Sequence, residues 1–329
     1  MAAYGLQTQI WNNNLKSGVL LAGFPILLTG LLFALVVVFQ SLSGSARDLP
    51  SGLQAAAFAM PSIIPFALAG AGGWFSIAFF AHQAIIDKST GAQKVERKDN
   101  PKLYNMLENL CISRGLQVPT LRIIETPVRN AYASGVREKS MSVTLTRGLI
   151  ETLDDAELEA VIAHELTHIR NKDVRLLVIA IIFVGIFSFV GEIMFRGMFR
   201  VNLVRNDRYR RSGGGNAGAL ILIAVLIVAV TWFLAVLVRF AISRRREFLA
   251  DAGAVELTRN PDAMISALQK ISGNSKLNAP PDVQQMFIEN AAAGGFKGLF
   301  ATHPSMEKRI AALVMMGGKV TPTTTGPWG

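Results

Sequence analysis

Long uncharged hydrophobic runs alternate with polar stretches along the chain, and these runs predict membrane helices. The first run covers residues 17–40 and the second covers residues 49–86. Both exceed the roughly 20 residues that a helix needs to cross a bilayer. Pro61 and Pro65 interrupt the second run. Because proline breaks helices, we place the second membrane helix at residues 66–86.

Two later hydrophobic runs, at residues 176–195 and 217–238, predict a second hairpin. Glu192 interrupts the first of these runs, and the link between them contains six arginines. Arginine favours cytoplasmic loops, so a hairpin whose link lies outside conflicts with this tendency. Two arrangements stay open. The hairpin crosses the membrane despite its charges, or it dips in and packs against the soluble part.

The polar stretches contain the elements of a soluble part. At Asn100-Pro101 an asparagine caps a helix whose first turn holds the proline. β-Branched residues in alternation predict strands at residues 121–124 and 142–146. A helix follows these strands, and its capping box is either residues 152–155 or residues 154–157.

Composition and charge agree with a membrane protein. Charged residues make up 17% of the chain and the mean hydropathy is +0.37, whereas soluble domains carry about 25% charged residues. The net charge is +10, which raises the question of nucleic-acid binding. The arginines lie beside the apolar runs, where they meet anionic lipid headgroups, so we expect a lipid bilayer and no nucleic acid as partner. Lys16 is the first basic residue, which argues against a cleavable signal peptide.

One short motif carries specific chemistry: His164-Glu165-Leu166-Thr167-His168. Two histidines four residues apart on a helix project from nearly the same side, so both imidazoles can bind one zinc ion. Glu165 lies beside the first histidine and can take a proton from water that the metal activates. The single cysteine, Cys111, excludes a cysteine-based metal site. We therefore predict one Zn²⁺ per chain.

Catalytic zinc usually has three protein ligands, so a third must come from elsewhere. Glu247 and Asp251 are one helical turn apart. One of them can bind the metal while the other orients a zinc-bound histidine. The spacing fits equally well a pair of surface carboxylates that form ion pairs with the arginines at residues 244–246. Glu256 and Glu192 are weaker rivals.

Four short segments resemble the HtpX-type membrane zinc metalloproteases, gluzincins related to the Ste24-type CAAX proteases. They are His-Glu-Leu-Thr-His-Ile-Arg-Asn-Lys-Asp at 164–173, Glu-Phe-Leu-Ala-Asp at 247–251, Asn-Ala-Tyr-Ala-Ser-Gly at 130–135, and Thr-His-Pro-Ser at 302–305, which is followed by Arg309. Their order, with a hydrophobic hairpin between the first two, also matches. The resemblance covers residues 18–315.

The resemblance implies roles for individual residues. Glu247 would be the third zinc ligand, and Asp251 would support a ligand from behind, near Arg309. His303 would stabilise the tetrahedral intermediate from the side opposite Glu165. Two further residues would lie on an edge strand that binds the substrate backbone by β-augmentation; they are Asn130 and Ala131.

We therefore expect a mostly α integral membrane protein with a zincin-like α+β metalloprotease domain, which combines a small sheet with the active-site helices. The expected division is a polar lead at residues 1–16, two transmembrane helices at 17–86, the first catalytic part with the His-Glu-Leu-Thr-His helix at 87–173, the second hydrophobic hairpin at 174–242, the second catalytic part with the third ligand at 243–316, and a disordered tail at 317–329.

The expected activity is that of a zinc-dependent endopeptidase, and the family implies misfolded or unassembled membrane proteins as substrates. We expect a multi-pass protein of the bacterial inner membrane. Its catalytic domain would face the cytoplasm, because five basic residues follow the second span within residues 88–102 while the preceding loop has one arginine. The alternatives are a catalytically silent zinc scaffold and a metal transporter whose path His82 and Glu192 would line.

Overall fold

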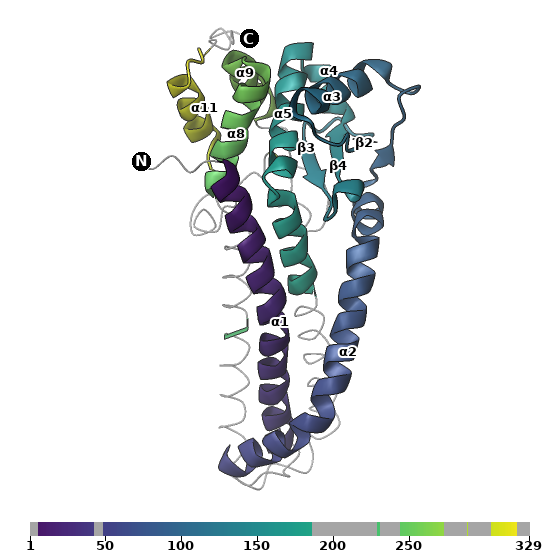
Figure 1. Ribbon diagram of the computed structural model, residues 1–329, viewed down its shortest axis with the longest axis vertical. Coiled ribbons are helices and arrows are strands. Elements are labelled where there is room, and N and C mark those ends of the chain that lie inside the picture. The colour runs from purple at the N-terminus through teal and green to yellow at the C-terminus, as the bar shows by residue number, and fades with distance from the viewer. Residues whose placement is uncertain are drawn as a thin grey trace, which may run out of the picture. The chain divides into compact units, whose positions relative to one another are not determined.

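The computed structural model describes residues 6–42, 49–185, 229–230, 244–272, 288 and 304–320 (Figure 1). The chain divides into two compact units. The first contains residues 1–15, 81–178 and 241–329, and the second contains residues 16–80 and 179–240. The first unit therefore holds the His-Glu-Leu-Thr-His motif, and the second holds most of the hydrophobic runs.

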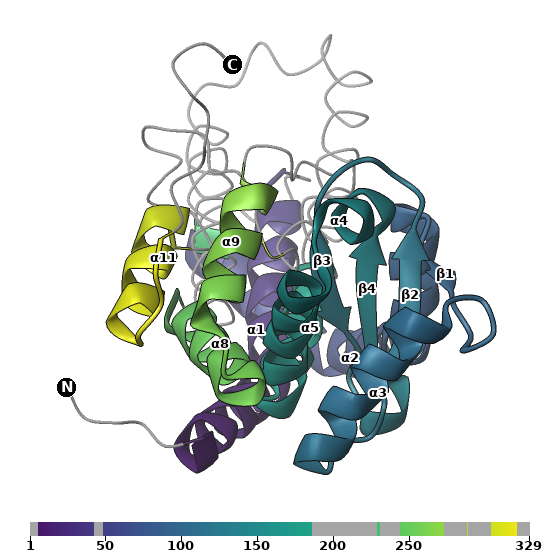
Figure 2. The ribbon, with the colours of Figure 1, turned by 90° about the horizontal axis from the view of Figure 1, so that it is seen from above.

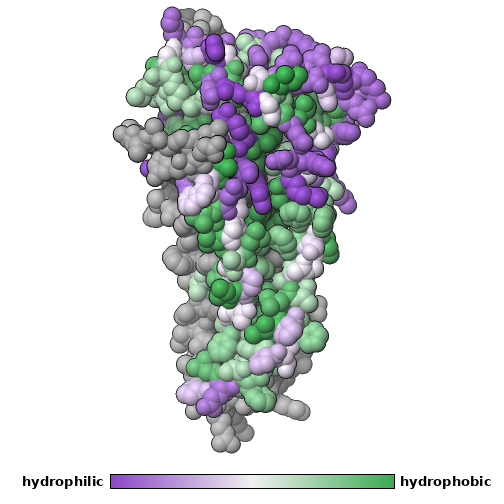
Figure 3. Space-filling model, viewed as in Figure 1, coloured by the Kyte–Doolittle hydropathy of each residue, from purple (hydrophilic) through white to green (hydrophobic). Residues whose placement is uncertain are grey.

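The described part of the second unit consists mainly of two long helices, α1 (Leu6–Leu42) and α2 (Leu49–Thr90). Residues 6–15 of α1 and 81–90 of α2 belong to the first unit. Within them, Ile10–Val37 and Pro50–Thr90 are long and apolar enough to cross a membrane. In the most hydrophobic window of each span, only 22% and 6% of the residues are buried. The surface of these helices is largely hydrophobic (Figure 3). Exposed apolar surface of this extent fits contact with lipid and would be unusual for the core helix of a soluble protein.

The expected break at the prolines of the second span is wrong. Helix α2 continues through Pro61 and Pro65. Each proline removes one backbone donor, but membrane helices tolerate this loss because neighbouring groups and local adjustments satisfy the freed carbonyls. Helix α1 begins at Leu6, so the polar lead is helical from that residue. The hydropathy pattern did not indicate that residues 6–16 are helical, because this segment is largely polar. Of the later hydrophobic runs, residues 176–185 are helical and the rest lies almost entirely outside the described residues.

A four-stranded mixed sheet belongs to the first unit. Its strand order is β1 (Gln93–Lys94), β2 (Thr120–Ile124), β4 (Ser142–Thr146) and β3 (Ala131–Ser134). Strands β2 and β4 are parallel, and the two outer pairs are antiparallel. Both predicted strands are confirmed. Strand β3 lies at one edge of the sheet. It contains Ala131, as expected, whereas Asn130 directly precedes the strand.

The helices of the first unit begin where capping residues stand. Asn100 accepts a hydrogen bond from the Leu103 amide at 3.1 Å and caps α3 (Pro101–Arg114), as predicted. Helix α5 (Asp155–Arg170) uses the second of the two possible capping boxes. The Asp154 side chain accepts from the Glu157 amide, and the Glu157 side chain accepts from the Asp154 amide, both at 2.9 Å. This register satisfies two donors of the first helical turn.

Helix α5 lies between the edge strand β3 and helix α8 (Arg244–Thr258) (Figure 2). The first unit also contains the short helices α4 (Arg147–Thr152), α9 (Pro261–Ile271) and α11 (Met306–Met315) and a short 3-10 helix, η1 (Glu138–Ser140). The apolar side of α5 joins a core formed with α3, the sheet and α9; among its fully buried members are Leu107, Val143, Val161, Ile162 and Leu268. This core holds α5 rigidly, and the motif histidines stand on that helix.

Candidate metal centre

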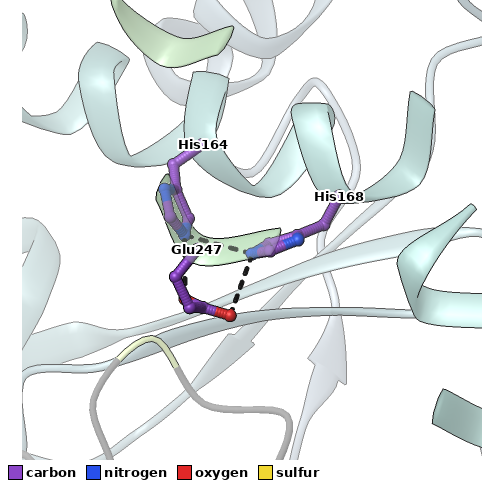
Figure 4. A group of neighbouring side chains, drawn as sticks. All are labelled: His164, His168 and Glu247. Atoms are coloured by element: carbon purple, nitrogen blue, oxygen red, sulfur yellow. Dashed lines mark hydrogen bonds and ion pairs between the residues drawn. The ribbon is translucent and has the colours of Figure 1, made fainter. Parts of the chain in front are cut away.

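His164, His168 and Glu247 converge on one point (Figure 4). The Nε2 atoms of the two histidines are 3.2 Å apart. One carboxylate oxygen of Glu247 lies 3.7 Å from Nε2 of His164, and the other lies 3.7 Å from Nε2 of His168. All three side chains are largely or fully buried, with exposures of 0%, 11% and 1%. The structure thus assembles two imidazoles and one carboxylate from helices about 80 residues apart in the chain.

The close approach of α5 and α8 depends on a glycine. A Cβ atom at Gly253 would collide with the side chain of Thr167. Thr167 is buried and its hydroxyl donates to the Ala163 carbonyl at 2.8 Å, so it has little room to move. Because Gly253 permits this contact, the turn of α8 that carries Glu247 reaches the histidines of α5.

Each histidine is held from behind by a carboxylate. Asp251 Oδ1 lies 2.9 Å from Nδ1 of His164, and Asp173 Oδ2 lies 3.1 Å from Nδ1 of His168. When Nδ1 of a histidine donates to a carboxylate, its Nε2 presents a lone pair to a metal. Both Nε2 lone pairs then point at the same place.

This donor set fits zinc. Ligand atoms about 2.0–2.1 Å from a tetrahedral zinc ion lie roughly 3.3 Å from one another. The observed separations of 3.2 and 3.7 Å between ligand atoms are close to this value. Two imidazoles and a carboxylate also match the protein ligands found in catalytic zinc sites, which leave a further position open.

Asp251 and Arg309 form a buried ion pair behind His164. Two guanidinium nitrogens donate to the two carboxylate oxygens at 2.9 and 2.6 Å. Burial alone would raise the pKa of Asp251, but the charge of Arg309 outweighs it and lowers the pKa to about 2. Asp251 therefore stays ionised and can accept from His164. Asp251 and Arg309 are therefore neighbours, as predicted.

The carboxylates around the three ligand side chains favour binding of a cation at this site. Burial alone lowers the pKa of His164, but hydrogen bonds to Asp251 and Glu247 outweigh burial and raise it to about 9. The carboxylates that hold a proton on this imidazole would equally attract a divalent metal.

Burial raises the pKa of Glu165, although the two histidines act against it. A carboxylate with a raised pKa is the better proton acceptor.

The rival third ligands are not at this site. Glu247 and Asp251 are buried, so they are not a surface pair. The Glu256 side chain is 55% exposed and pairs with Arg114 at 2.8 Å, away from the histidines. Glu192 lies outside the described residues.

The residues expected to bind substrate have partners within the chain. The Asn130 side-chain oxygen accepts from the amides of Ala131 and Ile288 at 2.9 and 3.1 Å. The Ala131 carbonyl also accepts from the Ile288 amide at 2.9 Å. At Ala131 the edge strand therefore accepts a hydrogen bond from a backbone amide of this same chain. β-Augmentation by a substrate peptide would use the same kind of bond. Substrate binding by Asn130 and Ala131 stays a prediction, and His303 lies outside the described residues.

Sequence reasoning missed Asp173 as a functional residue. Helix α5 ends at Arg170, and Lys172 adopts a left-handed conformation with φ 60°. This two-residue break shifts Asp173 out of the helical spacing of α5, and its side chain lies 3.1 Å from Nδ1 of His168. The signal was present, because Asp173 closes the ten-residue segment that begins with the motif, but its spacing of five residues from His168 does not match a helical face.

Comparisons with known proteins agree with this geometry. Residues 97–316 match the model of peptidase family M48. A protease HtpX homolog of Bacteroides fragilis is 46% identical over 324 residues, which cover 95% of this chain and 99% of the relative. A protease HtpX homolog of Dictyoglomus thermophilum is 38% identical over 248 residues, covering 74% of this chain and 79% of the relative.

Among solved structures, S. mikatae Ste24p is similar with a TM-score of 0.42 and 16% identity, covering 92% of this chain and 66% of that one. A likeness of this size carries no argument about function, so the assignment depends on the sequence relatives. They match 95% and 74% of the chain, and the family match includes His164, His168 and Glu247. The chain belongs to peptidase family M48 and is an HtpX-type membrane metalloprotease.

Proposed function

We propose that this metalloprotease uses zinc and that His164, His168 and Glu247 are its protein ligands. The observation that carries the proposal is their convergence within 4.8 Å, with a carboxylate behind each histidine. A zinc ion held there would supply Lewis acidity, which activates water and polarises the carbonyl of the scissile bond.

Glu165 acts as the general base and then as the general acid. It accepts a proton from the attacking water, whose oxygen bonds to the carbonyl carbon of the peptide. When the C–N bond breaks, the same carboxyl group returns a proton to the leaving amine. The burial that raises the pKa of Glu165 favours the first transfer, in which the carboxylate accepts a proton from water. His303 would stabilise the charge on the carbonyl oxygen, and Asn130 and Ala131 would align the substrate backbone.

The proposed substrates are misfolded or unassembled membrane proteins. The proposed location is the bacterial inner membrane, with the active site in the cytoplasm. Two apolar helices of sufficient length support membrane contact. The lysines and arginines that follow the second span support the orientation, since they favour the cytoplasmic side.

The test is zinc content and cleavage of an unfolded membrane protein by purified full-length enzyme in detergent. Glu165→Gln should keep one zinc and lose about 10²- to 10⁴-fold in kcat. Glu247→Ala should lose zinc. Matched controls on the same helices are Glu159→Gln and Glu256→Ala, which should behave as wild type. Full activity of Glu165→Gln would overturn the mechanism, and zinc retention by Glu247→Ala would overturn the ligand set.

A further inference from the structure

The N-terminal helix reaches the metal centre through one buried amide. Asn13, in α1, is 2% exposed. Its Nδ2 donates to Oδ1 of Asp173 at 2.7 Å and to the carbonyl of Asn171 at 2.8 Å. All three residues belong to the first unit. A residue near the start of the chain therefore contacts a segment some 160 positions later, immediately after the helix that carries the motif.

The two oxygens of Asp173 have different partners. Oδ1 accepts from Asn13, and Oδ2 lies 3.1 Å from Nδ1 of His168. A carboxylate held at one oxygen by a donor has less freedom to rotate, so its other oxygen stays aimed at the imidazole. Hydrogen bonds to an ionised acceptor are also about twice as strong as neutral ones. The second bond of the amide, to Asn171, fixes the backbone of the turn that carries Asp173.

We propose that Asn13 is a positioning residue for the metal ligand His168 and acts through Asp173. The inference rests on the proposed zinc site. It assigns a role to the N-terminal segment, whose sequence alone suggested only a polar lead. The affinity for zinc then depends on this first part of α1 being seated against the turn after α5.

The chain offers a matched control one residue away. Asn14 has the same side chain on the same helix but is exposed. Replacing it removes a side chain and alters helix propensity just as replacing Asn13 does. A second comparison is Asn13→Asp, which keeps the shape and replaces the donating amide with an acceptor that repels Asp173.

The experiment measures zinc affinity of the full-length protein in detergent by competition with a fluorescent chelator. Loss of a group that orients a ligand typically weakens metal binding 10- to 100-fold. Asn13 acts one step further away, so Asn13→Ala should weaken zinc about 3- to 10-fold. Asn13→Asp should weaken it at least as much, and Asn14→Ala should not change it. The visible spectrum of the Co²⁺-substituted protein should change in Asn13→Ala, because the geometry around His168 relaxes.

The outcomes separate this inference from the proposed site. If His168→Ala binds zinc as tightly as wild type, the ligand assignment itself fails. If His168→Ala loses zinc while Asn13→Ala and Asn13→Asp keep wild-type affinity and Co²⁺ spectrum, Asn13 does not position the ligand. A lower unfolding temperature of metal-free Asn13→Ala with unchanged affinity would likewise reduce Asn13 to a structural role and overturn the inference.

Discussion

The two histidines stand one turn apart on the same helix, yet they are supported in different ways. Behind His164 lies a buried ion pair between Asp251 and Arg309, contributed by α8 and α11. Behind His168 lies Asp173, which a neutral amide from α1 holds. The first support contains a full positive charge and the second does not. The two histidines are therefore oriented in a similar way by different means. The carboxylate behind His164 is neutralised by a charge, and the carboxylate behind His168 is held by a hydrogen bond from a neutral amide.

The largest expected difference between the two supports concerns stability. Arg309→Met should lower the free energy of unfolding by about 3–5 kcal/mol, because it leaves Asp251 buried and ionised without a counter-charge. Arg309→Lys should lose less, since it keeps the charge but not the two-pronged geometry. Denaturant titration of the metal-free protein measures both. The control is Arg147→Met, whose exposed partner is Glu125 and whose cost should be at most about 1 kcal/mol. Equal losses in the two Met variants would contradict the comparison.

The next effect separates metal affinity from stability. Asp173→Asn and Asp251→Asn should each weaken zinc binding about 10- to 100-fold, because both orient a histidine ligand. Only Asp251→Asn should also destabilise the metal-free protein strongly, because it leaves the buried charge of Arg309 without its carboxylate partner. Chelator competition and unfolding of the metal-free form give the two readings. A similar loss of stability in both variants would mean that the supports are energetically alike.

A smaller effect tests whether the supports are independent. In a double-mutant cycle on zinc affinity, Asn13→Ala and Asp173→Asn should be coupled by about 0.5–1 kcal/mol, because the residues share a hydrogen bond. Asn13 acts behind His168 and Asp251 behind His164, so the effects of Asn13→Ala and Asp251→Asn should add within about 0.5 kcal/mol. Strong coupling in the second cycle would show that the two supports act as one network.

The smallest expected change concerns Cys111, a fully buried thiol of α3. Burial raises its pKa from an ordinary 9.0 to about 11. The neutral thiol is therefore favoured by folding, and this contribution to stability is present below pH 9 and falls as the pH rises through 11. At pH 8 iodoacetamide should react as slowly in Asn13→Ala as in wild type, whereas Arg309→Met should react faster. Fast labelling of Asn13→Ala would indicate general loosening of the core.

Local signals predicted much of the first unit. Asn100 and the Asp154–Glu157 pair mark helix starts because a side chain can satisfy the first amides of a helix. The strands at 121–124 and 142–146 follow from β-branched residues in alternation. The break at Pro61 and Pro65 failed as a prediction. Each proline removes one backbone donor, but this cost does not exceed the benefit of continuing a long apolar helix.

The sequence by itself determined the geometry within one helix. Four residues of helical spacing place His164 and His168 on one side and Glu165 beside them, whatever the rest of the chain does. Spacing left Glu247 and Asp251 open between a metal-site pair and a surface pair. The resemblance to known proteases assigned their roles and added Arg309. Only the tertiary structure decided that Asp173 and Asn13 belong to the same site. Their hydrogen bond joins positions 160 residues apart. Such a bond depends on how separate helices pack, and the spacing of residues along the sequence does not predict that packing.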